Sequence, residues 1–138
     1  MNHPAQGMQP NILELDAKAR YKYFIQRLVA KREVWGLYQD GWAVSATASG
    51  KIALPLWPDA KYARLCKTKL WAGHEVTAMP LKTLVEQLIP LLSEQQGQAS
   101  VFLTPDWQSV LVEPERLLAD IKDYLYTCFQ QEQQQQQQ

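Results

Sequence analysis

The chain has 138 residues, of which 46% are apolar and 20% charged, and its formal net charge at pH 7 is zero. This length and composition are typical of one globular domain with an ordinary hydrophobic core. They argue against a membrane protein, because no apolar run approaches the roughly 18 residues of a span, and against a nucleic-acid binder, which would carry a basic excess.

The zero net charge conceals an imbalance between the two halves of the chain. Residues 1–70 contain 11 Lys and Arg against five carboxylates, and residues 71–138 contain three against nine. The halves therefore carry +6 and −6. Either they complement each other inside one fold, or a basic face meets an acidic partner.

The N-terminal residues and the number of cysteines indicate the cellular compartment. Residues 1–10 have no charged stretch followed by an apolar one, as a secretory signal would. The two cysteines, Cys66 and Cys128, are too few for a disulfide framework. We therefore expect a cytoplasmic protein with both thiols reduced.

Both ends of the chain differ in composition from the middle. Residues 1–10 are polar and contain Pro4, Gly7 and Pro10, which predicts a flexible arm. Residues 130–138 are glutamine except for Glu132 and cannot bury a core of their own. This glutamine-rich tail is either disordered or an extension of the preceding helix. We expect a single α+β domain over residues 11–129.

The domain begins with a predicted helix over residues 12–32. Apolar residues recur at steps of three and four along it, which predicts one buried stripe: Ala17, Tyr21, Phe24, Ile25 and Leu28. Asn11 is the predicted N-cap, and Glu14 three residues later would complete a capping box.

A β-hairpin is predicted next. Asp40-Gly41 separates strands at 34–39 and 42–46, and this dipeptide is typical of a two-residue turn. The register would pair Gln39 with Trp42 and place four side chains on one core face: Trp35, Leu37, Trp42 and Val44. A third strand is predicted at 52–56, where Pro55 indicates an edge strand or a local irregularity.

The second half alternates helices and short strands. Proline opens each predicted helix, at 59–68, at 81–93 and from Pro114 onward. In the first of these, Tyr62, Leu65 and Cys66 would be buried, and Lys61 and Arg64 exposed. Pro90 should kink or shorten the last turn of the second. Strands are predicted at 74–79, 101–104 and 109–113. Leucines and other apolar residues would face inward from the last two helices: Leu81, Leu84, Val85, Leu88, Leu91, Leu92, Leu117, Leu118, Ile121, Leu125 and Cys128.

These elements have the order α-βββ-α-β-α-ββ-α. Predicted hairpins outnumber βαβ crossovers. The fold class is therefore α+β, a mostly antiparallel sheet with about four helices packed on it.

The residues that usually carry chemistry do not form a recognised catalytic set. His3 and His74 are too far apart in sequence for a structural zinc site, and no glycine-rich phosphate loop is present, so we expect no metal and no cofactor. His74 could activate Cys66 as a nucleophile, but a small buried residue at position 66 is the favoured interpretation. Glu113 and Glu115 could form an acid/base pair, although a helix N-terminus explains Glu115 better. Enzymatic activity stays open, with the balance against it.

Tryptophans are the most informative residues of this sequence. The chain has five, and Trp35 and Trp42 are explained by their strand positions. Core periodicity does not explain the other three, which stand at a strand end, in a loop and in a turn: Trp57, Trp71 and Trp107. Trp57 and Trp71 bracket the helix that carries Lys61, Tyr62 and Arg64. Such an aromatic and basic cluster can hold an anionic ligand or anchor a protein partner, unless these indoles only cover the ends of the core.

Several short stretches together resemble a known family. They include Arg20-Tyr21-Lys22-Tyr23-Phe24, Glu33-Val34-Trp35-Gly36-Leu37-Tyr38, Asp40-Gly41-Trp42-Ala43, Leu54-Pro55-Leu56-Trp57-Pro58, Tyr62-Ala63 and Val112-Glu113-Pro114. In this order, over roughly residues 15–125, the chain resembles the bacterial family of domain of unknown function 2750. The resemblance implies a small cytoplasmic bacterial α+β protein and implies no activity and no site residues.

Two functional hypotheses follow, beside a third and weaker one, RNA binding by the basic first half, which predicts salt-sensitive retention on heparin. The first is a non-catalytic protein-interaction module, because no catalytic set is present and three tryptophans lack a core role. The alternative is a binder of a small anionic ligand, or an enzyme acting on one, with a pocket beside the helix at 59–68. Both use the same residues: Trp57, Lys61, Tyr62, Arg64, Trp71 and Trp107.

Overall fold

A computed structural model of the chain describes residues 12–136. The arm predicted at residues 1–10 and the cap predicted at Asn11 lie outside these residues. The elements are, in chain order, η1 (Ile12–Glu14), α1 (Ala17–Lys31), β1 (Glu33–Tyr38), β2 (Ser45–Ala46), β3 (Ile52–Leu56), α2 (Ala60–Leu65), η2 (Lys69–Trp71), β4 (Glu75–Pro80), α3 (Leu81–Thr83), η3 (Leu84–Leu88), α4 (Ile89–Glu94), β5 (Gln98–Val101), β6 (Val110–Val112) and α5 (Pro114–Gln136).

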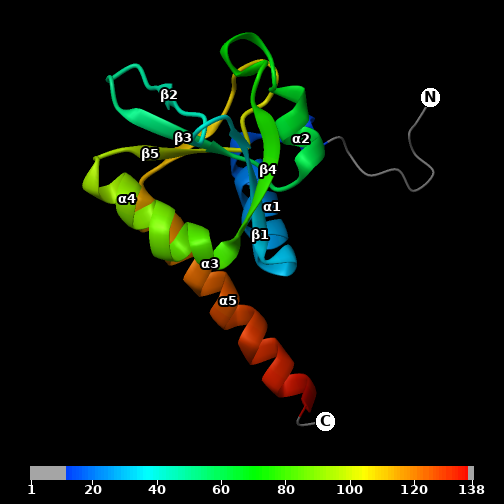
Figure 1. Cartoon of the computed structure of the whole chain (residues 1–138). Coiled ribbons are helices and arrows are strands. Elements are labelled where there is room, and N and C mark those ends of the chain that lie inside the picture. Colours follow the sequence, from blue (N-terminus) through cyan, green and yellow to red (C-terminus); the bar gives the residue numbers. More distant parts are fainter. Residues whose placement is uncertain (1–11, 137–138) are drawn as a thin grey trace, which may run out of the picture.

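The strands form two small sheets, and helices pack around both (Figure 1). β1 pairs with β4, and the second sheet has the order β2-β3-β5-β6. Every pairing is antiparallel except β3 with β5. The predicted α+β class and the element order α-βββ-α-β-α-ββ-α are confirmed.

The first helix begins later than its apolar pattern suggested. Residues 12–14 form a 3₁₀ turn, and α1 starts at Ala17, where the carboxylate of Asp16 accepts a hydrogen bond from the backbone N–H of Ala19 at 2.8 Å. Asp16 is therefore the N-cap, with the geometry that such caps prefer. Arg20 is buried on the same helix and donates from its guanidinium to the carbonyl of Leu15 at 2.8 Å.

The predicted pairing of the first two strands is wrong. β1 pairs along its whole length with β4, from Glu33↔Pro80 to Tyr38↔Glu75. The Asp40-Gly41 turn does form, but it brings Tyr38, not Gln39, opposite Trp42, and only as an isolated bridge. β1 forms a six-residue ladder with β4, whereas the segment after the turn meets β1 only at one isolated bridge. That segment then continues into β2 in the other sheet. Val44, predicted in the core, is 51% exposed as a result.

The strand that contains Pro55 is central and not an edge strand. β3 lies between β2 and β5. Its ladder to β2 ends at Ala53, before Pro55, so the missing N–H of the proline removes no hydrogen bond on that side. Pro55 pairs in regular register with Ser100 of β5, so the predicted edge position and the predicted irregularity are both wrong.

A π-helical segment accommodates the proline inside the next helix. Residues 81–94 are continuous helix, but residues 84–88 are π-helical, and the N–H of Ile89 bonds to the carbonyl of Leu84 five residues earlier. Pro90 has no N–H and would clash with the carbonyl four residues back in an α-helix. The wider turn before Pro90 removes that conflict. Leu91, predicted to face inward, is 45% exposed.

The strands after this helix are displaced from their predicted places. β5 covers residues 98–101, not 101–104, because Phe102 adopts a left-handed φ of 55° and ends the strand. β6 is limited to residues 110–112. The parallel β3–β5 contact joins segments that residues 57–97 separate in sequence, and local patterns did not indicate it.

The last helix runs much further than the body of the protein. α5 continues through the glutamines to Gln136, so the structure favours the second of the two possibilities left open for the tail. Leu117 and Ile121 are fully buried, while residues 129–135 are all exposed. The C-terminal half of α5 extends away from both sheets (Figure 1). Among residues 12–136, no helix combines the length and the apolar composition that crossing a membrane requires.

Candidate functional site

The three tryptophans that core periodicity does not explain lie in a row. The ring centroids of Trp57 and Trp71 are 6.4 Å apart at an interplanar angle of 86°, and those of Trp71 and Trp107 are 5.2 Å apart at 51°. Both arrangements are favourable for aromatic pairs. Trp57 is 0% exposed, Trp71 6% and Trp107 43%, so the row leads from the interior to the surface.

Trp57 forms the inner end of the row. Its backbone exchanges two hydrogen bonds with Trp35, at 2.9 and 2.8 Å, which ties the end of β3 to β1. Its indole N–H donates to the carbonyl of Leu103 at 2.8 Å. Because both its ring and its polar atom are satisfied in the core, Trp57 positions its neighbours and does not reach solvent.

A tight turn after β5 presents Trp107 at the outer end. Thr104 holds this turn: its backbone carbonyl accepts from the N–H of Trp107 at 2.8 Å, and its N–H donates to the carbonyl of Gln108 at 2.8 Å. The Thr104 hydroxyl also accepts from the N–H of Gln108 at 3.2 Å. Trp107 adopts a left-handed φ of 61°, which is uncommon for a residue with a side chain. The hydrogen bonds of Thr104 and the contact with Trp71 keep the indole in this position.

One basic side chain lies over the exposed indole, and an exposed leucine follows it in the sequence. The ammonium group of Lys69 lies 5.5 Å from the ring centroid of Trp107, within the range of a cation–π contact. Leu70, the next residue, is 92% exposed. We call Lys69, Leu70 and Trp107 the Trp107 surface.

The helix predicted at 59–68 is shorter and less buried than expected. α2 covers residues 60–65, and Leu65 is 49% exposed, contrary to the prediction. Tyr62 and Cys66 are buried and Arg64 is exposed, as predicted. Lys61 places its ammonium group 5.1 Å from the ring centroid of Tyr62.

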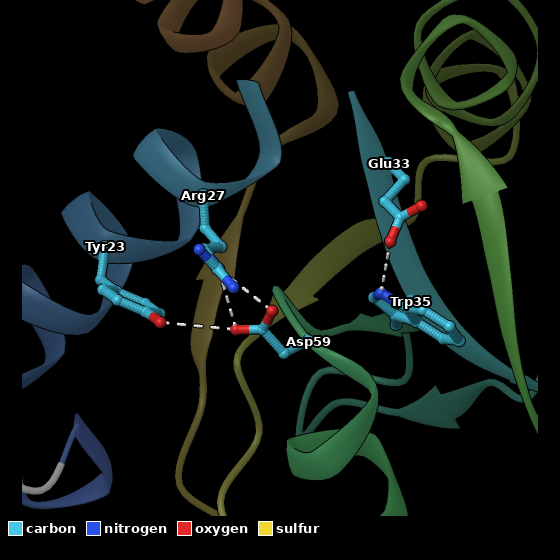
Figure 2. Close-up of polar contacts among 5 residues, drawn as sticks. All are labelled: Tyr23, Arg27, Glu33, Trp35 and Asp59. Atoms are coloured by element: carbon cyan, nitrogen blue, oxygen red, sulfur yellow. Dashed lines mark hydrogen bonds and ion pairs between the residues drawn. The ribbon is translucent and has the colours of Figure 1, made fainter. Parts of the chain in front are cut away.

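Asp59, the acidic residue before α2, forms an ion pair with Arg27 of α1. Figure 2 shows Tyr23 and Arg27 reaching from α1 toward Asp59, whose carboxylate accepts from Arg27 Nε at 3.0 and 3.2 Å and from the Tyr23 hydroxyl at 3.4 Å. On β1, the indole N–H of Trp35 donates to Glu33 at 3.1 Å. Burial raises the pKa of Tyr23, and the Asp59 charge raises it further. The ion pair of Arg27 with Asp59 fastens α1 to α2.

Cys66 is a buried thiol and not an activated nucleophile. Its Sγ donates to the carbonyl of Leu103 at 3.3 Å, the same carbonyl that accepts from Trp57. Burial raises the pKa of Cys66 to about 11, and a hydrogen bond with Trp57 lowers it only in part. A thiol with this pKa is protonated at pH 7, whereas nucleophilic catalysis needs the thiolate. Within residues 12–136, His74 Nδ1 has no hydrogen-bond partner, and no group of three or more His, Cys, Asp or Glu could hold a metal ion.

Two adjoining hollows lie elsewhere, between α1 and α5. Their volumes are about 410 and 430 Å³. They share Lys18, Tyr21, Arg116 and Asp120, and neither is lined by any of the six predicted site residues. The Tyr21 hydroxyl donates to Asp120 at 2.5 Å, and Asp120 also pairs with Arg116 at 3.1 Å, so these three side chains of the groove satisfy one another.

The structure thus brings some of the predicted residues together and separates others. Trp57, Trp71 and Trp107 form one row, but only Trp107 is open to solvent. Tyr62 packs on Phe102, with ring centroids 4.8 Å apart, and belongs to the core. The sequence did not single out Lys69 or Leu70. The signal that would have indicated them is an apolar residue directly after Lys67-Thr68-Lys69, in a stretch that no longer follows helical periodicity.

Comparison with protein families supports the resemblance seen in the sequence. Residues 21–121, most of the chain, match the family described as Protein of unknown function (DUF2750). Comparisons with curated proteins and with solved structures found no match. The matched residues contain most of α1, the helices α2 to α4, both sheets and the tryptophan row. The chain therefore belongs to the family Protein of unknown function (DUF2750).

Proposed function

We propose that this protein is a non-catalytic protein-interaction module that binds an acidic segment of a partner protein through the Trp107 surface. The observation that carries the proposal is the Trp107 indole, which is 43% exposed and packs against the buried ring of Trp71. Tryptophan is enriched among the few residues that dominate binding energy at interfaces. Because the buried row holds this indole, little conformational entropy would be lost on binding.

The apolar part of the surface supports a protein partner. Leu70 is 92% exposed and follows Lys69, whose ammonium group contacts the Trp107 ring. Trp107 and Leu70 together offer an apolar contact at the end of the molecule where η2 meets the turn after β5. A partner that covers both side chains would remove apolar surface from water, which is the main driving force of association.

The charge around the surface favours an acidic partner. Residues 60–74 contain four basic residues and no acidic residue: Lys61, Arg64, Lys67 and Lys69. Among residues 12–136, the ion pairs closer than 4.0 Å involve none of these four cations. Unpaired cations beside an apolar anchor attract and orient an acidic segment. We also propose that the protein acts in the cytoplasm, where its free thiols Cys66 and Cys128 would stay reduced.

The test is site-specific photo-cross-linking of the full chain in living bacteria. A benzophenone amino acid at position 70 should capture a partner, and the captured peptide should be acidic. The same probe at position 44 is the control, because Val44 is 51% exposed and lies in the segment before β2, away from the tryptophan row. Capture at position 70 but not at position 44 supports the proposal.

Charge and anchor variants complete the test. Lys69→Glu and Trp107→Ala should each abolish capture from position 70, whereas Lys69→Arg should retain it. Equal capture at positions 44 and 70, or capture that Lys69→Glu leaves unchanged, contradicts the proposal.

Less supports the alternative of a small anionic ligand held beside α2. Trp57 and Trp71 are 0% and 6% exposed, so neither offers a ring face to a ligand in solution. The guanidinium of Arg27 is already paired with Asp59. A thermal-shift screen of nucleotides, sugar phosphates and carboxylates tests this alternative. A rise in the melting temperature that Lys61→Ala and Arg64→Ala abolish would favour it over the protein partner.

A further inference from the structure

The C-terminal half of α5 carries two large aromatic side chains that the other elements among residues 12–136 leave largely exposed. Tyr126 is 62% exposed and Phe129 55%, and both belong to the C-terminal half of α5. Leu125 is half-buried and lies next to Phe129 along the helix. Leu125 and Cys128 pack partly against the core, so the two aromatic rings are the apolar surface that the fold leaves open on this half of the helix.

The spacing along this face is that of a coiled coil. Positions 118, 122, 125, 129 and 132 follow one another at steps of four and three residues. They carry Leu118, Lys122, Leu125, Phe129 and Glu132. The apolar residues Leu125 and Phe129 are in the middle, and charges of opposite sign stand outside them.

This face of α5 is complementary to the same face of a second copy whose helix runs in the opposite direction. In an antiparallel pair of helices, residues at equal distances from the centre oppose each other. If the centre is at residue 127, Leu125 opposes Phe129 of the second copy, and Lys122 opposes its Glu132. Twofold symmetry then produces each contact twice. A parallel pair would instead oppose Lys122 to Lys122 and Glu132 to Glu132.

We propose that two copies of this chain associate through an antiparallel coiled coil of their α5 helices, centred near residue 127. Apolar layers of Leu125 and Phe129 drive the contact, and two ion pairs of Lys122 with Glu132 set its direction. Lys122 and Glu132 are both exposed and have no ion pair within residues 12–136. The contact is smaller than a standard interface, so the dimer should dissociate in the micromolar range.

Sedimentation equilibrium of the full chain provides the first test. The wild type should show reversible dimerisation. Lys122→Glu and Glu132→Lys alone should each weaken it about tenfold, since each creates two like-charged pairs, and the two changes together should restore it. Thr127→Lys is the matched control, because it adds the same charge on the side of α5 that faces the groove with α1 and should change nothing.

Disulfide trapping tests the direction of the helices. In a Cys128→Ser background, Leu125→Cys and Phe129→Cys are made separately and then mixed under mild oxidation. The antiparallel pair predicts that the disulfide between positions 125 and 129 forms faster than either symmetrical one. Three results would overturn the proposal: a chain that stays monomeric up to about 1 mM, far above the expected micromolar dissociation constant; a charge swap that fails to restore the dimer; or faster formation of the symmetrical disulfides.

Discussion

The indole of Trp71 separates Trp57 in the core from Trp107 at the surface, and its ring centroid lies 5.2 Å from that of Trp107. One residue therefore belongs to the hydrophobic core on one side and supports the proposed binding surface on the other. Substitution of Trp57 or Trp71 should therefore affect folding, whereas substitution of Trp107 should affect binding of the partner.

The first prediction compares truncation at the two ends of this contact. Trp71→Ala should lower the free energy of unfolding by about 3–5 kcal/mol, because it leaves a cavity under Trp107. Trp107→Ala should cost only about 1–2 kcal/mol, because this indole is 43% exposed. Urea denaturation followed by circular dichroism measures both losses. Trp107→Phe serves as the control that retains a ring on Trp71, and equal losses at positions 71 and 107 would refute the assignment.

The second prediction concerns the shared acceptor in the core. The carbonyl of Leu103 accepts from the indole of Trp57 and from the thiol of Cys66. Trp57→Phe or Cys66→Ala alone leaves this buried carbonyl with one donor, but the two together leave it with none. The double variant should therefore lose about 1 kcal/mol more than the sum of the single losses. A cycle of Trp57→Phe with Cys128→Ala should be additive, and additivity in both cycles would show that the carbonyl is satisfied in another way.

The third prediction is a loss of stability in alkali that depends on Cys66. Burial raises the pKa of this thiol to about 11 in the folded chain, against about 8.5 for an unperturbed cysteine. Since the folded value is the higher one, the thiol favours the folded state fully below the unfolded pKa. That contribution, on the order of 3 kcal/mol, should disappear between roughly pH 8.5 and 11.

Urea titrations at several pH values measure this loss. Cys66→Ala should make the loss of stability with rising pH less steep. Part of the loss should remain, because the pKa values of Tyr23 and Tyr62 are also raised. A decline between pH 8.5 and 11 that is equally steep in the variant would show that the thiol does not contribute.

The positions of most elements could be predicted because they depend on local signals. Apolar residues at helical spacing located α1, apart from its start, and alternating apolar residues and an opening proline located β3 and α5 within a few residues. The partner of β1 could not be predicted in this way. The Asp40-Gly41 turn is a local signal for a hairpin, whereas pairing with β4 depends on which distant strand offers the longer ladder. The turn formed, but the tertiary fold determined that β1 pairs with β4 and not with the segment after the turn.

The candidate site shows the same division between local and tertiary information. Periodicity assigned Trp35 and Trp42 to the core, where both are only partly buried, and left the other three tryptophans unexplained. It could not say that Trp57 and Trp71 would be buried and Trp107 exposed, because the ring contacts join residues 57, 71 and 107 across three different segments. Leu70 was overlooked for a related reason. Only the 3₁₀ turn at residues 69–71 directs Trp71 inward while leaving Leu70 outside.

The fourth prediction uses two glycines that face different neighbours. A Cβ at Gly97 would lie 3.0 Å from the backbone carbonyl oxygen of Ile52, at the start of β3. A Cβ at Gly73 would lie 3.1 Å from the amide end of the Gln39 side chain. A flexible side chain can move by a few tenths of an ångström, but a strand backbone can move only if its ladder is disturbed.

Gly97→Ala should therefore lower the free energy of unfolding by about 1–3 kcal/mol, in the range of overpacking. Gly73→Ala should stay within about 0.5 kcal/mol of the wild type, as most surface substitutions do. Thermal or urea unfolding of the two variants side by side measures the difference, and Gly97→Ser should be no milder than Gly97→Ala. If Gly97→Ala were neutral, the loop between α4 and β5 would have to be free to shift away from Ile52, and the close approach of these segments would not be a constraint on the fold.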